Sequence, residues 1–131
     1  MCTAWERILD VTLAELSDAL GRVPDRQWEE VIVTGICDDS RRVRPGCLFV
    51  AVPGAIHDGA DYVADAIAKG AAAVVSERDI ATDVPHVRVE NARASLARIA
   101  ASFYGSPTES LDTIGVTGTS GKTTVCHWIA H

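Results

Sequence analysis

Short aliphatic runs alternate with helix-period segments along most of this chain. Such runs, bounded by glycine, proline or polar residues, predict buried strands, and the segments between them predict helices of about ten residues. Strands that alternate with helices form layered α/β structures with a mainly parallel sheet. We therefore predict an α/β fold, with strands at 31–33, 48–52, 71–76 and 86–89.

Three segments carry helix start and stop signals. Each begins at a residue whose side-chain oxygen can accept a hydrogen bond from the first turn. Each is followed by glycine, which readily takes the left-handed conformation that ends many helices. In the first segment, Thr12 and Glu15 have the spacing of a capping box. The predicted helices run over about 12–20 before Gly21, from Asp61 to Gly70, and from Asn91 to Gly105.

The composition excludes several classes of function. With 12 basic and 18 acidic residues the net charge is −6, so a nucleic-acid-binding surface is not expected. No apolar run approaches the roughly 20 residues that span a bilayer, and the first residues do not resemble a signal peptide. We therefore expect a cytoplasmic protein without membrane contact, whose four dispersed cysteines are reduced.

A glycine-rich segment lies between an aliphatic run at 111–116 and the predicted start of a helix. Backbone N–H groups in such a turn, together with the helix N-terminus, can bind phosphate oxygens. Lys122 could reach the outer phosphates, and Thr123 could offer its hydroxyl to Mg²⁺. The alternative is an ordinary turn before a helix. The candidate ATP-binding residues are Gly118, Thr119, Ser120, Gly121, Lys122, Thr123 and Thr124.

Several motifs, in order along the chain, resemble the Mur ligases, the ATP-dependent amide-forming enzymes of peptidoglycan synthesis. Residues 115–124 resemble the ATP loop of that family, and 39–51 with 57–59 resemble its uridine-nucleotide-binding domain. Residues 103–107 are more similar to the ligase that adds the third amino acid than to the later ligase that adds D-alanyl-D-alanine. The sequence departs from the family pattern at Cys47, where an acidic residue is usual, and at Ser120, where asparagine is common.

The resemblance implies a binding site for a UDP-linked sugar substrate. Ser40 is the residue expected to hydrogen-bond this substrate, with Asp38 beside it, while Ala55, Ile56 and His57 would line the uracil and phosphate region. A hydroxyl in a loop between two strands can donate or accept such a bond. The imidazole could equally be an ordinary loop group that binds the aspartate next to it.

Three arginines close to this segment have two possible roles. Arg41, Arg42 and Arg44 add positive charge to an acidic chain, which would favour an anionic nucleotide. Alternatively, they form a solvated face that pairs with Asp38 and Asp39. The sequence does not decide between these roles.

By the same resemblance, residues 1–108 form a UDP-sugar-peptide-binding domain, and 109–131 form the truncated start of an ATP-binding domain: its first strand, phosphate loop and helix start. The parent ligase would use ATP and Mg²⁺ to activate UDP-N-acetylmuramoyl dipeptide, and the amine of a diamino acid would then complete the amide. The diamino-acid site falls outside this chain. We therefore expect a monomer with no catalytic residue of its own, no firmly bound ATP or Mg²⁺ and no turnover.

Two alternatives remain open at this point. The chain could be a stand-alone module that captures UDP-linked precursors without ATP chemistry. It could also derive from the later ligase of the same family, which adds D-alanyl-D-alanine. Which diamino acid the parent would use cannot be read from these residues.

Overall fold

A four-stranded parallel sheet forms the centre of the computed structural model, which describes residues 10–110 and 114–129. The strands lie in chain order, with the sequence β3-β4-β5-β6 across the sheet. A separate antiparallel pair joins β1 to β2. The strands are β1 (Val11–Thr12), β2 (Ile32–Val33), β3 (Gly35–Cys37), β4 (Cys47–Val50), β5 (Ala73–Ser76) and β6 (His86–Arg88).

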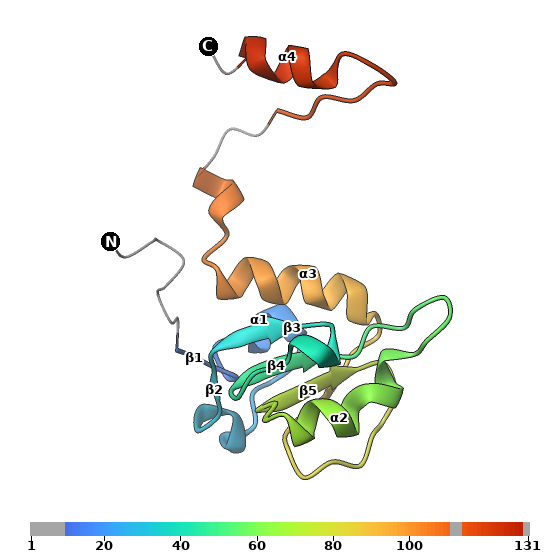
Figure 1. Cartoon of the computed structure of the whole chain (residues 1–131). Helices are drawn as coiled ribbons and strands as arrows, with labels where there is room; N and C mark the ends of the chain where they lie inside the picture. Colours follow the sequence, from blue (N-terminus) through green and yellow to red (C-terminus); the bar gives the residue numbers. More distant parts are fainter. Residues whose placement is uncertain (1–9, 111–113, 130–131) are drawn as a thin grey trace.

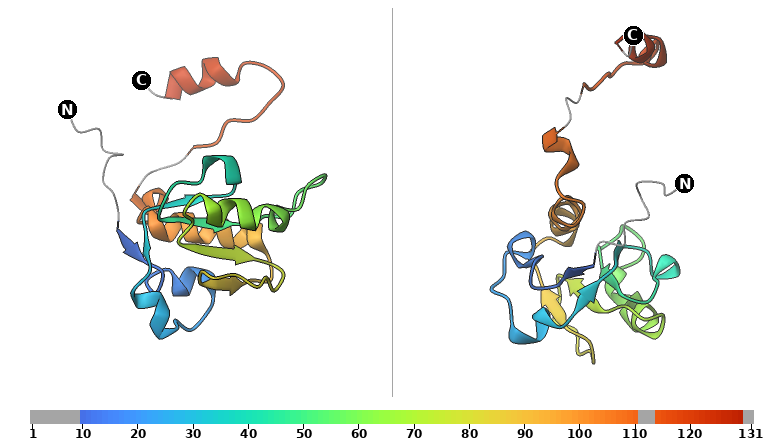
Figure 2. Two further views of the ribbon diagram at one scale, coloured as in Figure 1. Left: turned by 60° about the horizontal axis from the view of Figure 1, so that its bottom comes forward. Right: turned by 90° about the vertical axis from the view of Figure 1, so that its left-hand side faces the viewer.

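Helices cover both faces of this sheet (Figures 1 and 2). The α-helices are α1 (Ser17–Leu20), α2 (Val63–Ala68), α3 (Ala92–Phe103) and α4 (Lys122–Ile129). Short 3₁₀ turns are η1 (Arg26–Glu29), η2 (Ser40–Arg42), η3 (Gly59–Tyr62) and η4 (Pro107–Ser110). The α/β class predicted from the alternating pattern is therefore confirmed.

The alternation of side chains along the strands divides the core into two layers. Leu48 and Val50 of β4 pack on the side of α1 and α3, together with Ile99. Cys47 and Phe49 face the opposite side, where α2 packs. Because successive strand residues point to opposite faces, strands covered on both sides become continuously apolar. All four residues of β4 and of β5 are accordingly buried.

Capping explains where two of the helices begin. Asn91 accepts a hydrogen bond from the backbone N–H of Ala94 at 2.8 Å, as predicted for the start of α3. The Thr12–Glu15 capping box also forms, with the Thr12 N–H donating to Glu15 at 2.7 Å. The helix after this box is shorter than predicted, however, because residues 13–16 form turns and α1 begins only at Ser17.

The predicted cap of the second helix was wrong. Asp61 lies inside η3 and does not cap α2, whose first residue follows Tyr62 without a side-chain cap. The capping residue is Asp58, which accepts from the Ala60 N–H at 2.9 Å and so starts the 3₁₀ turn that leads into α2.

The structure differs from the predicted strands in two segments. Residues 35–37 were assigned to no strand, yet they form β3 because β4 offers its free edge to them. The predicted strand at 111–116 lies partly outside the described residues, and its described part, 114–116, has no strand structure. A single strand has no partner to satisfy its backbone groups.

The predicted helix after the glycine-rich segment is present as α4. None of its described residues is buried, and Figure 1 shows it beyond the end of α3, away from the sheet. Gly121 has φ of +76°, a conformation that L-residues rarely take, at the point where the chain enters the helix.

Candidate functional site

Two loops meet at the carboxyl ends of neighbouring strands. Residues 38–40 follow β3 directly, and the loop at 53–58 follows β4. Because β3 and β4 are parallel, both loops leave the sheet at the same edge. Ligands of open α/β sheets bind in crevices outside this edge, so the arrangement marks the candidate site.

A cleft of about 610 Å³ lies between these loops. It brings together three residues predicted to bind the UDP-linked substrate: Asp38, Ser40 and His57. Tyr62 of η3 also lines it and packs edge-on against His57, with ring centroids 6.2 Å apart. The cleft therefore combines a carboxylate, a hydroxyl and two rings, a mixture suited to a heterocycle with polar edges.

The two other predicted residues lie outside this cleft. Ala55 and Ile56 are both exposed, and Ile56 is 88% accessible to solvent. Their loop is held by a hydrogen bond of 2.9 Å from the Gly54 N–H to the His57 carbonyl. At the end of the loop, a Cβ on Gly59 would stand 2.7 Å from the backbone of Val52, so only glycine permits this close approach.

Ser40 is held in place by Lys69, the residue that directly follows α2. Ser40 is only 7% exposed, and its carbonyl accepts a hydrogen bond from Lys69 Nζ at 2.9 Å. Lys69 also pairs with Asp65 at 2.9 Å. Hydrogen bonds from Lys69 and from the Ser40 hydroxyl hold the pKa of Asp65 below its usual value. Sequence reasoning missed Lys69, because it is 29 residues from Ser40 and no local signal links them.

Asp39 organises the turn that presents Ser40. Its carboxylate accepts from the Arg41 backbone N–H at 2.9 Å and from two nitrogens of the Arg41 side chain. These bonds from Arg41 lower the pKa of Asp39 to about 2. Arg41 is thus engaged by Asp39, whereas Arg42 and Arg44 form no ion pair among the described residues. The structure therefore separates the three arginines into one paired group and two unpaired groups.

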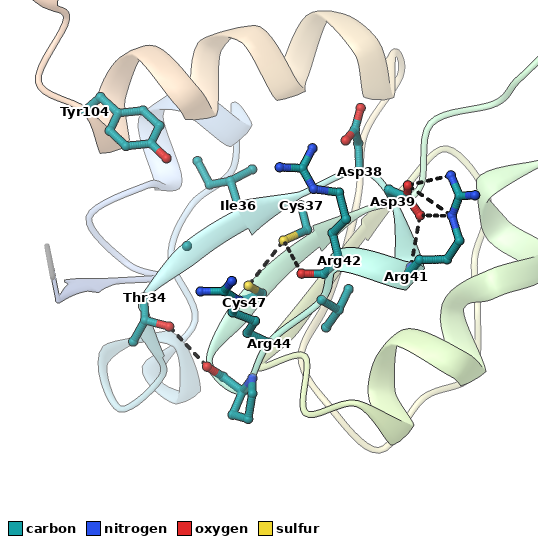
Figure 3. A pocket seen from close by; sticks show the side chains of 13 residues that line it. Thr34, Ile36, Cys37, Asp38, Asp39, Arg41, Arg42, Arg44, Cys47 and Tyr104 are labelled. Carbon is teal, nitrogen blue, oxygen red and sulfur yellow. Dashed lines mark hydrogen bonds and ion pairs between the residues drawn. The ribbon is translucent and has the colours of Figure 1, made fainter. Parts of the chain in front are cut away.

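A second cleft, of about 860 Å³, runs along β3 on the other side of η2 (Figure 3). Arg42 and Arg44 line it, and Tyr104 at the end of α3 closes one side. At its floor the Sγ atoms of Cys37 and Cys47 are 3.3 Å apart. Burial, and then the neighbouring Cys47 thiol, raise the pKa of Cys37 to about 11.

The residues of the candidate ATP loop are exposed. Lys122 Nζ donates to the carbonyl of Gly118 at 2.5 Å, so its ammonium group already lies against the turn that would hold phosphate. Thr123 is in the first turn of α4 and is exposed. The segment offers backbone N–H groups, one ammonium group and one hydroxyl. This set of groups fits a nucleoside triphosphate with Mg²⁺.

The described residues contain neither a metal-binding cluster nor a membrane-spanning helix. No cluster of three or more His, Cys, Asp or Glu side chains there could hold a metal ion. Within the same ranges, every helix is too short or too polar to cross a membrane.

Comparison with known proteins assigns the family. The family model described as "Mur ligase family, catalytic domain" matches residues 32–104, more than half of the chain. This chain belongs to the Mur ligase family, as its motifs suggested.

Individual relatives point to one branch of this family. The chain is 46% identical over 129 residues to the UDP-N-acetylmuramoyl-L-alanyl-D-glutamate–2,6-diaminopimelate ligase of Streptomyces coelicolor, covering 94% of this chain and 25% of that protein. It is 53% identical over 97 residues to the ligase of the same name from Pseudomonas putida, covering 70% and 20%. The chain thus spans about a quarter or less of the length of these relatives.

A solved structure supports the same family. The UDP-N-acetylmuramoylalanyl-D-glutamyl-2,6-diaminopimelate–D-alanyl-D-alanyl ligase of Acinetobacter baumannii is 27% identical and superimposes with a TM-score of 0.69. The match covers 88% of this chain and 26% of that one. The folded layers described above are therefore those of a Mur ligase.

Proposed function

We propose that this chain provides the UDP-substrate-binding part of a ligase that adds a diamino acid to UDP-N-acetylmuramoyl-L-alanyl-D-glutamate. The observation that carries the proposal is the smaller cleft, which gathers Asp38, Ser40 and His57 at the carboxyl edge of the sheet. There the hydroxyl and the carboxylate would bind polar edges of the uridine, and unpaired Arg42 would meet the diphosphate. Ala55 and Ile56, exposed nearby, would close over the bound nucleotide.

The segment that ends in α4 would bind ATP. In this proposal residues 1–108 hold the UDP-linked substrate and 109–131 begin the ATP-binding domain. Gly118–Thr124 would surround the phosphates, Lys122 would exchange its bond to Gly118 for a phosphate oxygen, and Thr123 would contact Mg²⁺. In the parent enzyme, bound ATP would supply the phosphoryl group that activates the substrate carboxylate, and Mg²⁺ would neutralise charge on the phosphates. We place the parent enzyme in the cytoplasm, acting as a monomer.

The relatives favour 2,6-diaminopimelate as the diamino acid. The two sequence relatives reported above, at 46% and 53% identity, both carry this substrate in their names. The second alternative, a fragment of the later ligase, is thus less well supported. A stand-alone module that captures UDP-linked precursors would use the same cleft and differs in lacking ATP chemistry.

Ligand binding tests the proposed site without requiring turnover. UDP-N-acetylmuramoyl dipeptide at 100 times its dissociation constant should stabilise the chain by about 2.7 kcal/mol and raise its melting temperature. ATP alone should change the melting temperature little, because an unsupported loop loses conformational entropy when it orders around a ligand. The same sugar peptide carrying ADP instead of UDP is the matched control, and equal stabilisation by both would contradict a uridine site.

A substitution then assigns the binding to this cleft. Ser40→Ala should weaken binding of the UDP-linked substrate by about 0.5–1.5 kcal/mol, the usual net value of one hydrogen bond. Ser102→Ala, on the exposed side of α3, is the control.

Phosphate release in the presence of UDP substrate, ATP and diaminopimelate should stay at background for this chain. Clear turnover would show that the catalytic residues are within it.

A further inference from the structure

The larger cleft contains a pair of thiols in direct contact. Cys37 ends β3 and lies opposite Phe49, while Cys47 begins β4 and lies opposite Gly35. The two cysteines are therefore offset along the sheet, yet their side chains lean toward each other and bring the Sγ atoms to 3.3 Å (Figure 3). A Cβ on Gly35 would stand 3.4 Å from the sulfur of buried Cys47, so the glycine avoids a side-chain contact with this sulfur.

The separation of the sulfurs selects what can join them. A disulfide bond is about 2.05 Å long, so the two sulfurs would have to approach each other by more than 1 Å to form one. A single thiophilic atom bonded to both sulfurs at about 2.3 Å holds them about 3.8 Å apart at a tetrahedral angle and about 3.3 Å apart near 90°. The pair is thus spaced for a pyramidal centre with bond angles close to 90°.

We propose that Cys37 and Cys47 form a dithiol site that binds trivalent arsenicals. An arsenoxide, R–As=O, would form two S–As bonds, and its oxygen would leave as water with both thiol protons. Arsenic stays trivalent, so the step needs no oxidant or reductant. The third bond of arsenic is to the group R, which the cleft of about 860 Å³ can accommodate.

The protonation state of Cys37 agrees with this ligand class. Burial and the adjacent thiol raise the pKa of Cys37 to about 11, so it reacts slowly with reagents that require a thiolate. A reagent that bonds both sulfurs gains from the second bond, which forms within the same molecule. The proposal does not depend on the function proposed above.

Mass spectrometry of the folded chain with phenylarsine oxide tests the site. We expect one phenylarsenic group per chain, added with loss of one water. An excess of a dithiol should remove this group. A monothiol at the same total thiol concentration should not remove it, because arsenic bonded to two protein sulfurs resists exchange with a monothiol. The Cys2→Ser/Cys126→Ser double variant should behave as the unaltered chain. Cys37→Ser and Cys47→Ser should each lose the resistance to monothiol.

Labelling of the cysteines in the unsubstituted chain gives a second test, which does not depend on variants that could unfold. Phenylarsine oxide should slow labelling of Cys37 and Cys47 by N-ethylmaleimide at least tenfold, while exposed Cys126 is still labelled when monothiol is present. Labelling of all three cysteines at unchanged rates would overturn the proposal. Loss of two mass units instead of arsenic addition, which marks a disulfide, would also overturn it.

Discussion

Removing the amino group of Lys69 should loosen the turn that presents Ser40. Lys69 Nζ donates to the Ser40 carbonyl and to Asp65, each at 2.9 Å. Lys69→Met keeps most of the aliphatic stem but leaves the partly buried carbonyl without its charged donor. A hydrogen bond to a charged group contributes about 1.5–3 kcal/mol. The lysine side chain is 38% exposed, so water recovers part of this, and we expect a loss of about 1–2 kcal/mol.

Urea unfolding followed by circular dichroism measures this loss. With a slope of about 2 kcal/mol per molar, the midpoint should fall by roughly 0.5–1 M. Asp65→Asn is the matched control, since it removes the exposed ion pair, keeps an oxygen that can accept from the Ser40 hydroxyl, and leaves the bond from Lys69 to Ser40. Its midpoint should hardly change, because exposed pairs contribute little. Equal losses in the two variants, or none in Lys69→Met, would refute the assigned role of the bond to Ser40.

Three other predictions follow from single contacts. Asn91→Ala removes the cap of α3 and should lower the unfolding free energy by about 1 kcal/mol in urea, whereas Asn91→Asp should retain most of it. Ile99→Ala opens a cavity at a fully buried position and should cost about 2–5 kcal/mol, seen as a lower melting temperature. Burial lowers the pKa of His86 below 6.5, so the unfolded chain binds this proton first and stability should fall as pH drops below about 6.5. His86→Gln should flatten that pH dependence, and an unchanged slope would assign it to other groups.

The geometry around His86 supports the direction of that pH effect. The Ser76 hydroxyl donates to the carbonyl of Arg78 at 2.6 Å, so its oxygen is left to accept from His86 Nε2–H at 2.7 Å. A neutral imidazole protonated at Nε2 satisfies this bond, and the second proton gains no new partner from Ser76. The cost of burying the charge therefore outweighs the opposing effects of Asp79 and the Arg78 backbone, and the pKa of His86 is lowered.

Much of the fold could be predicted from short stretches of the sequence. The aliphatic runs of β4 and β5 were recognisable because strands buried on both faces need continuous apolar residues. The cap at Asn91 was predictable because its partner lies only three residues away. The family motifs were likewise recognisable without coordinates, since the order and spacing of residues define them.

Interactions between distant segments were not predictable in this way. The sequence of β3 is short and begins with glycine, and it becomes a strand only because the edge of β4 satisfies its backbone. Lys69 reaches Ser40, and Cys37 reaches Cys47, through the packing of α2 and the register of two strands. Residue order alone determined the α/β class, the family and the candidate ligand groups. Tertiary structure decided which of those groups share a cleft, because side-chain contacts across a sheet depend on register and layer packing rather than on spacing along the chain.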